Sequence, residues 1–381
     1  MSHVSFMPRR DFALWEKLAN GRKLYSFDFE LTARCNLNCR HCYINLPVSD
    51  KDARAAELSV AEISDIADQA IELGALWCLI TGGEPLLRPE FSDIYLMLRR
   101  KGLLLSVFTN ATLIQPDHVS LFKKHPPQAI EITVYGATSE TYERITRRVG
   151  SYTKFLHGVE SLLEAGLPVS LKAMALRSNL HEMKAIAAFA KSQSREIYRF
   201  DPHLILRYDR NAERNREIRS ERLTPAEIVA LERADSERFG SLLRNCEHYI
   251  DKAHEQTTSD HLFFCGAGRN TFSLGYDGTF RLCSALFAPG TTVNLRECSL
   301  RRAWEELVPR VRNLRSADPD YLKTCRRCAL VNLCEYCPAH ADLETGRLDG
   351  ATPYFCELAH ARAAAIEQSS VQRAEKDEMV G

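Results

Sequence analysis

Three cysteines lie close together near the start of the chain, in the stretch CNLNCRHCY that runs from Cys35 to Tyr43. Cys35, Cys39 and Cys42 have the spacing CxxxCxxC. A disulfide uses two thiols and a closed structural zinc site uses four ligands, so three thiolates fit neither. Soft thiolates favour iron–sulfur clusters, zinc or copper(I). The spacing leaves two interpretations open: an iron–sulfur cluster with one iron free of protein ligands, or a zinc site completed by His41 or a distant cysteine.

A second group of seven cysteines lies toward the C-terminus. Its members are Cys265, Cys283, Cys325, Cys328, Cys334, Cys337 and Cys356. Two CxxC pairs in this group suggest zinc, but the five residues between them are fewer than the ~12 to 20 of common zinc ribbons. A zinc site on those pairs would also leave the other three cysteines without a role. Of the remaining cysteines, Cys78 is expected in the core and Cys298 in a loop.

The composition narrows the class of protein. The 381 residues indicate one large or two moderate domains, and 50 basic residues balance 50 acidic ones. Bulk charge therefore gives no indication of a nucleic-acid or membrane-surface partner. No apolar run approaches the ~18 to 20 residues of a membrane span, and the N-terminal MSHVSFMPRRDF lacks an apolar signal core. We expect a cytoplasmic protein, whose reduced thiols serve metal or redox sites.

Strand-like and helix-like segments alternate from residue 24 to residue 206. The expected strands, several of them with their following loops, are 24–32, 75–85, 103–112, 129–138, 167–176 and 196–206. The expected helices are 58–74, 91–102, 116–125, 151–166 and 180–193, with the sixth left open. This alternation predicts an α/β fold with a parallel sheet and helices outside. Six units fit an open, partial (β/α)6 TIM-like barrel, in which chemistry sits at the carboxyl ends of the strands. The segments CNLNCRHCY, TGGEP, FTNAT and VYGAT lie at those ends.

The rest of the chain differs in character. The densely charged tract 207–222 predicts a solvated helix or linker, with a substrate-facing surface as the alternative. Thr224 and Pro225 have the types expected where a helix begins. After about residue 260 come short strand-like pieces, Gly-rich turns and cysteines. The expected organisation is an N-terminal segment, a barrel, a charged helical linker, a small cysteine-rich domain and a tail, over residues 1–23, 24–206, 207–259, 260–360 and 361–381.

CxxxCxxC after the first expected strand and GGEP after the second resemble the radical S-adenosylmethionine (SAM) enzymes over roughly residues 24–206. In that family three cysteines hold a [4Fe–4S] cluster whose fourth iron chelates SAM. Reductive cleavage of SAM then gives a 5′-deoxyadenosyl radical that abstracts a hydrogen atom. The cofactor supplies the reactive species, while the protein positions and shields it. The resemblance implies that Cys35, Cys39 and Cys42 are the cluster ligands.

The same resemblance implies contacts to SAM. Gly82, Gly83 and Glu84 match the motif that receives the SAM amino group, since glycines permit close approach and a carboxylate suits an ammonium. His41 stands where the family usually has an aromatic residue near adenine. Further expected contacts, each with an alternative, are Thr109 and Asn110 as ribose or carboxylate partners or as a polar strand cap, and Lys172 as a carboxylate partner or a solvent-facing residue.

The second cysteine group resembles the SPASM extension of radical SAM enzymes, on CGAG, the YDG turn and the CxxCx5C run. One departure is that two residues, Glu335 and Tyr336, stand where three are common. The resemblance implies one auxiliary cluster on Cys325, Cys328, Cys334 and Cys356, and another on Cys265, Cys283 and Cys337. Seven thiolates cannot fill eight positions, so either one iron is open or the eighth ligand is Cys246, His261 or Asp260.

The segments from 132 to 182 and from 198 to 228 are similar in texture to maturases of ribosomally made peptides. This implies a precursor peptide as substrate, and a thioether, a carbon–carbon crosslink, epimerisation or cleavage as outcome, of which we favour the thioether. Only 34 residues precede Cys35, so we expect a separate leader-recognition protein or docking at a sheet edge. Three [4Fe–4S] clusters, about 12 irons, and a reducing flavodoxin or ferredoxin complete the expectation. The alternatives are a maturase of a folded protein of the formylglycine type, and a non-catalytic electron-transfer or zinc-binding protein.

Overall fold

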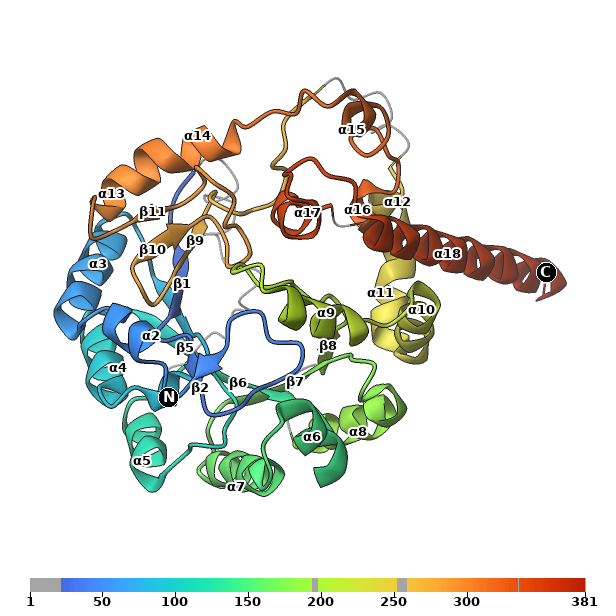
Figure 1. Cartoon of the computed structure of the whole chain (residues 1–381). Helices are drawn as coiled ribbons and strands as arrows, with labels where there is room; N and C mark the ends of the chain where they lie inside the picture. The colour runs from blue at the N-terminus through green and yellow to red at the C-terminus, as the bar shows by residue number, and fades with distance from the viewer. Residues whose placement is uncertain (1–21, 194–197, 252–258, 335, 381) are drawn as a thin grey trace, which may run out of the picture.

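The structure is a computed structural model that describes residues 22–193, 198–251, 259–334 and 336–380. The segment predicted over 1–23 and Glu335 therefore lie wholly or almost wholly outside the described residues. Six parallel strands form the predicted partial barrel in the order β1-β4-β5-β6-β7-β8. Their bounds are β1 Ser26–Glu30, β4 Trp77–Thr81, β5 Leu104–Thr109, β6 Ala129–Val134, β7 Val169–Met174 and β8 Arg199–Asp201. The sheet curves around an open interior, and helices cover its outer face (Figure 1).

All five helices predicted between the strands are present. They are α3 Val60–Glu72, α4 Phe91–Arg100, α5 Pro116–Lys124, α7 Ser151–Glu164 and α8 Met183–Gln193. Four short elements were not predicted separately. They are the helices α2 Lys51–Ala56 and α6 Ser139–Thr146, and the 3₁₀ turns η2 Pro85–Leu87 and η3 Leu180–Glu182. Helix α3 begins at a capping box between Ser59 and Glu62, and the chain leaves it through Gly74 at φ +106°.

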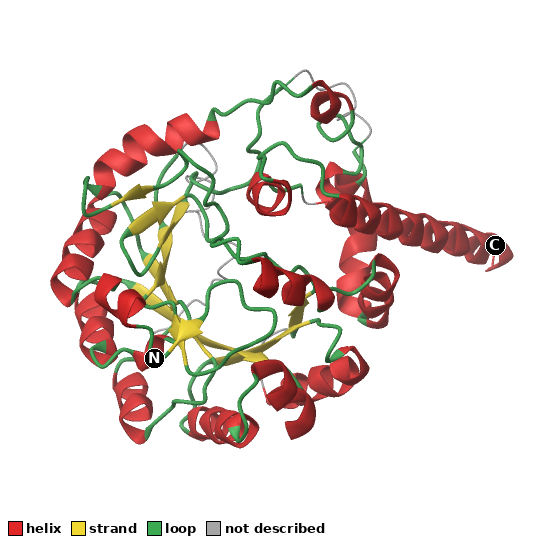
Figure 2. Cartoon of the chain, viewed as in Figure 1, coloured by secondary structure: helices red, strands yellow, loops and turns green. Residues whose placement is uncertain are grey.

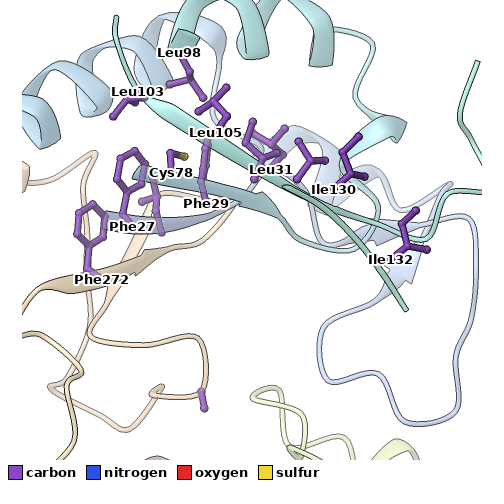
Figure 3. Packing of buried hydrophobic residues seen from close by; sticks show 14 of the residues in the cluster. Phe27, Phe29, Leu31, Cys78, Leu98, Leu103, Leu105, Ile130, Ile132 and Phe272 are labelled. Carbon is purple, nitrogen blue, oxygen red and sulfur yellow. The ribbon is translucent and has the colours of Figure 1, made fainter. Parts of the chain in front are cut away.

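Strand residues alternate between an apolar outer face and a polar inner face. Phe27 and Phe29 on β1 and Leu105 on β5 pack against the helices with Leu98 (Figure 3). Cys78 is 1% exposed in the same layer, so its predicted core position is confirmed. Because successive strand side chains point to opposite faces, the residues between these apolar ones point into the barrel.

The sheet does not end at β1. Strand β9, Thr271–Leu274, pairs with β1 in parallel, and β10, Thr279–Arg281, and β11, Val293–Asn294, follow in antiparallel order. The rings of Phe27 and Phe272 stack with centroids 5.2 Å apart. The cysteine-rich region thus contributes strands to the same nine-stranded sheet, which crosses the predicted boundary at residue 260.

The charged tract was predicted as a solvated helix or linker, and it is a helix that is partly buried. It forms α9, Ala212–Ser220, in which Asn215 is 6% exposed and Ile218 is fully buried, and Arg207 before it is 3% exposed. The next helix, α10 Pro225–Ala234, begins as predicted, with Thr224 as its cap and Pro225 at its first position. Helices α11 Ser236–Arg244 and α12 Cys246–Tyr249 follow.

The last hundred residues are mainly helical and irregular (Figure 2). Their helices are α13 Leu300–Arg302, the π-helical turn η5 Ala303–Leu307, α14 Val308–Arg312, α15 Pro319–Lys323, α16 Val331–Cys334, α17 Pro338–Thr345 and α18 Pro353–Val380. Helix α18 extends away from the body (Figure 1). Near its start the Arg362 guanidinium pairs with Glu232 of α10 and donates to the Leu333 carbonyl of α16. Cys298 lies in a bend before α13, as predicted. In the described residues no helix combines the length and apolar character of a membrane span.

Candidate functional site

A cavity of about 340 Å³ opens inside the barrel, at the carboxyl ends of the strands. The loops singled out in the sequence meet around it, since parallel strands bring their ends to one edge. The predicted site residues that line it are Cys35, Cys39, His41, Cys42, Gly82, Gly83, Thr109, Asn110 and Lys172. Ser284, next to Cys283 of the second cysteine group, lines the same cavity. The fold therefore gathers most of the predicted site in one place.

The three-cysteine loop runs from β2, Arg34–Cys35, to β3, Leu46–Pro47, which pair in parallel. Backbone N–H groups of Leu37 and Asn45 donate to the sulfurs of Cys35 and Cys42, each at 3.4 Å. Burial raises the pKa of the Cys39 thiol, and the charges of Cys42 and Cys35 raise it further, so the three sulfurs lie close together. Thiolates that repel one another and accept N–H bonds suit a positively charged metal cluster.

A single bound ion would need a different arrangement. In the described part of the chain, no three histidine, cysteine or carboxylate side chains are close enough together to hold one metal ion. The cysteines of an iron–sulfur cluster bind different irons and do not need to meet at one point.

Gly82 and Gly83 are required by close backbone contact. Gly82 has φ +129°, and a Cβ there would lie 2.3 Å from the Thr32 carbonyl oxygen. A Cβ on Gly83 would lie 2.3 Å from the Arg34 carbonyl oxygen. The Gly83 N–H donates to Thr32 at 2.7 Å, and the Glu84 N–H donates to Arg34 at 2.9 Å. The glycines thus join the end of β4 to the start of the cysteine loop, while their contact with SAM stays a prediction.

The Glu84 carboxylate ties β4 to β5. It accepts hydrogen bonds from the Thr109 hydroxyl at 2.8 Å, the Asn110 N–H at 2.7 Å and the Leu86 N–H at 3.1 Å. The side chain is fully buried, and burial raises its pKa to about 7 although the hydrogen bonds oppose the shift. In this arrangement Glu84 positions Thr109 and Asn110, and its contact with the SAM amino group stays a prediction.

An amide network connects β5 to the cysteine loop. The Asn110 side chain donates to Asn36 at 3.0 Å and approaches the Cys35 sulfur at 3.8 Å. Asn36 in turn donates to the Thr112 hydroxyl at 2.8 Å. Asn36 and Thr112 were not predicted as site residues, although both are polar and lie in the segments CNLNCRHCY and FTNAT.

His41 is a buried, neutral imidazole beside the cluster ligands. Its ring centroid lies 5.1 Å from that of Tyr135, and its Nδ1 has no hydrogen-bond partner within the described residues. Burial, aided by the charge of Arg214, lowers its pKa to about 4. Tyr135 also bonds to the Cys39 thiol and lowers its pKa. Tyr135 was missed, although the VYGAT loop that carries it was identified.

Lys172 lies inside the barrel. Its ammonium pairs with Glu131 at 2.9 Å and lies 3.4 Å from the ring centroid of Phe108. Burial lowers the pKa of Lys172, whereas Glu131 raises it. Lys172 thus lines the cavity as a partly buried, paired ammonium, and its contact with SAM stays a prediction.

Acidic side chains dominate the charged lining of this cavity. Asp28 and Glu30 on β1, Glu131 on β6 and Asp201 on β8 line it, and Lys172 is the only ammonium or guanidinium in the described lining. Burial raises the pKa of both Asp28 and Glu30. The alternation of acids and phenylalanines in SFDFE was the available signal for the two residues on β1.

In the second cysteine group the sulfurs influence one another within two separate sets. Burial raises the pKa of the Cys337 thiol to about 12, and the charges of Cys283 and Cys265 raise it further. In the same way, Cys328 and Cys325 raise the pKa of Cys356 beyond the effect of burial. Each predicted set therefore has three sulfurs in mutual electrostatic contact.

The candidates for an eighth ligand lie in different surroundings. Cys246 packs in one apolar cluster with Cys334, beside the set that already has four cysteines. The Asp260 carboxylate pairs with Arg315, and the backbone of His261 bridges to the same residue. These placements favour none of the three for the set of Cys265, Cys283 and Cys337, and the ligand assignment stays a prediction.

Residues 29–190 match the family model described as the Radical SAM superfamily. The chain is 26% identical to an AdoMet-dependent heme synthase of Methanosarcina barkeri, over 86% of this chain and 94% of that protein. It is 30% identical to the antilisterial bacteriocin subtilosin biosynthesis protein AlbA of Bacillus subtilis, over 42% of this chain and 35% of that protein. Streptococcus suis SuiB, solved bound to precursor peptide SuiA, shares the fold with a TM-score of 0.68 at 16% identity, over 90% of this chain and 78% of SuiB.

Proposed function

We propose, from the radical SAM domain that this chain carries over residues 29–190, that the protein modifies a ribosomally made peptide by hydrogen abstraction. The observation that carries the proposal is the single cavity shared by Cys35, Cys39 and Cys42 with the glycines of GGEP. Those cysteines would hold a [4Fe–4S] cluster. The cluster and SAM, when bound, supply a carbon-centred radical. The residues around them position the cofactors and exclude water.

The charge of the cavity supports a peptide substrate. Four carboxyl side chains and one ammonium line it. Glu30 and Glu131 have cationic partners, and the charged lining is acidic on balance. A peptide brings backbone N–H groups, and a basic side chain would add charge-assisted hydrogen bonds. A substrate rich in carboxylates would meet like charge in a partly buried site, which is unfavourable.

A second candidate function is a radical reaction on a tetrapyrrole. The observation in its favour is the match to the heme synthase, which covers 94% of that protein, whereas the match to AlbA covers 35% of AlbA. The acidic lining opposes this candidate, since the propionate groups of an iron porphyrin are anionic.

The set of Cys265, Cys283 and Cys337 supports a role in holding the substrate. Ser284 lines the cavity directly after Cys283, so an auxiliary cluster on this set would adjoin the substrate. With three thiolates, that cluster would have one iron free to bind a substrate thiol, such as the acceptor cysteine of a thioether. A complete second cluster on Cys325, Cys328, Cys334 and Cys356 would bring the total to three.

The proposal includes partners. A flavodoxin or ferredoxin in the cytoplasm would supply electrons, and a separate leader-recognition protein would present the precursor peptide. β8 is the last strand of the sheet within the described residues, and its outer edge, where Arg238 donates to the Phe200 carbonyl, offers an alternative place for direct docking of an extended leader.

Anaerobic reconstitution tests the cofactor chemistry. The wild-type protein is expected to bind about 12 irons, and with dithionite and SAM to release 5′-deoxyadenosine. The variant C35A/C39A/C42A should lose about four irons and all SAM cleavage, whereas the loop variant C298A should behave as wild type. A fully reconstituted wild-type protein that leaves SAM intact would contradict the proposal.

A substrate comparison separates the two candidates. The reconstituted enzyme is incubated either with a short peptide encoded beside its gene or with iron-coproporphyrin III. A crosslinked peptide is expected to lose two hydrogen atoms by mass spectrometry, while the porphyrin spectrum stays constant. Conversion of the porphyrin without change in the peptide would favour the tetrapyrrole reaction instead.

A further inference from the structure

Two arginines of the charged tract reach the backbone of the three-cysteine loop. The Arg214 guanidinium donates to the Cys39 carbonyl at 2.9 Å and to the Asn45 side-chain oxygen at 3.3 Å. The Arg207 guanidinium donates to the Asn45 carbonyl at 3.1 Å. These bonds span about 160 to 175 residues of sequence, so they fix α9 over the loop.

Arg214 is itself held in place. Its other nitrogen pairs with Glu217 at 2.7 Å on the same helix, and its side chain is 17% exposed. The α9 platform is anchored by the buried Ile218 and by Asn215, whose side chain accepts the Arg207 N–H at 2.8 Å. Because Glu217 already fixes the Arg214 side chain, its hydrogen bond to the loop costs little additional side-chain entropy.

The opposite side of the loop is also held. The N–H groups of Asn38 and Arg40 donate to the carbonyls of Thr146 and Ile145 at the end of α6, at 2.9 and 3.1 Å. The loop is therefore clamped between α6 and α9. Because the α6 side uses only backbone groups, the charged contacts that can be changed by substitution lie on the α9 side, and of these Arg214 is the one that bonds to the backbone of a cysteine.

The charge of Arg214 acts on the site as well as its hydrogen bonds. Its guanidinium lies 2.9 Å from the Cys39 carbonyl oxygen, so a positive charge is held directly beside the three-cysteine loop. A positive charge beside an iron–sulfur cluster stabilises the more negative, reduced state. Glu217, which pairs with Arg214, weakens this effect.

We propose that Arg214 is a positioning residue for the three-cysteine loop, and that its charge raises the reduction potential of the cluster held there. This inference rests on the proposed function, because it requires a cluster on Cys35, Cys39 and Cys42. It assigns the charged tract a part in tuning the redox chemistry of the barrel.

The test compares R214Q, R214K and E217Q in the reconstituted full-length protein. The EPR signal that changes on addition of SAM identifies this cluster among the others, and its potential is followed by redox titration. R214Q should lower the potential, R214K should restore it toward the wild-type value, and E217Q should raise it. The control R216A removes an exposed arginine of the same helix and should leave the potential unchanged.

The outcomes are distinguishable. Equal potentials in wild type, R214Q and E217Q would overturn the electrostatic role, and full iron content in R214Q would overturn the positioning role. If R214Q does not fold, the other two variants still test the charge. R214K keeps the positive charge at position 214, and E217Q removes the carboxylate that pairs with it. A wild-type protein without any SAM-responsive signal would instead refute the proposed function.

Discussion

Arg281 and Glu30 form an ion pair of 2.5 Å in which both side chains are only 2% exposed. The pair joins β10 of the cysteine-rich region to β1 of the barrel, two residues before Cys283. The Arg281 guanidinium also lies 4.3 Å from the ring centroid of Phe287. The strand that leads to one auxiliary ligand is thus locked to the wall of the cavity.

Breaking this pair is expected to destabilise the protein strongly. R281M leaves the Glu30 carboxylate buried without its counter-charge, which typically costs about 3–5 kcal/mol. Chemical unfolding of the purified protein measures the loss. The control R301M removes one partner of an exposed pair with Glu72 and should cost less than about 1 kcal/mol. Equal effects of R281M and R301M would show that burial does not govern the pair.

Replacing Gly83 should separate the GGEP loop from the cysteine loop. The added Cβ in G83A would collide with the Arg34 carbonyl oxygen, which is backbone and cannot swing away. We expect lower iron content and at least a tenfold weaker SAM affinity, about 1.4 kcal/mol, measured by iron assay and equilibrium dialysis. G240A is the matched control, because a Cβ there meets only the flexible end of Arg244. Wild-type binding by G83A would refute this account.

The stability that the Glu62–Arg296 ion pair adds between α3 and the cysteine-rich region should depend on pH. Hydrogen bonds from Arg296 lower the pKa of Glu62 to about 2, against an ordinary value of 4.5. A lowered carboxylate pKa adds stability above pH 4.5, and this is lost as pH falls through 2. E62Q should therefore lower the free energy of unfolding at neutral pH, by under about 1 kcal/mol for so exposed a pair. The difference, measured by chemical unfolding at each pH, should vanish near pH 2. A difference that grows on acidification would have the wrong sign.

Cys246 and Cys334 are expected to differ in their effect on iron content. C334A removes a proposed ligand of the set with Cys325, Cys328 and Cys356, so it should lose up to about four irons. C246A should keep the wild-type iron content, because the proposed set beside it already has four cysteines. Inductively coupled plasma analysis of reconstituted protein gives the count. A loss of iron in C246A would make this residue the missing eighth ligand.

The barrel could be predicted because its signals are local. Each strand places apolar residues against the helices, and α10 beyond the barrel begins with its cap at the expected position. Helix α6 was missed because SETYERIT is short and mostly polar. The pairing of β9 with β1 was also missed, because nothing in either segment specifies a partner some 245 residues away.

The site residues that could be predicted are likewise those with local sequence signals. Cysteine spacing and GGEP identified the residues around the cavity, since neighbours in sequence form each loop. Arg207 and Arg214 were assigned to a solvated tract because a dense charge run normally lies in water. Their partners are backbone carbonyls and an amide of the cysteine loop, and backbone acceptors leave no trace in a sequence.

The nine-stranded sheet has a consequence for dividing the gene. A chain that stopped before Thr271 would strip β9 from β1 and open a hydrogen-bonding edge beside the ring of Phe27. Bare edges of this kind recruit strands from other molecules. The barrel and the cysteine-rich region are therefore expected to need expression as one chain and to unfold together.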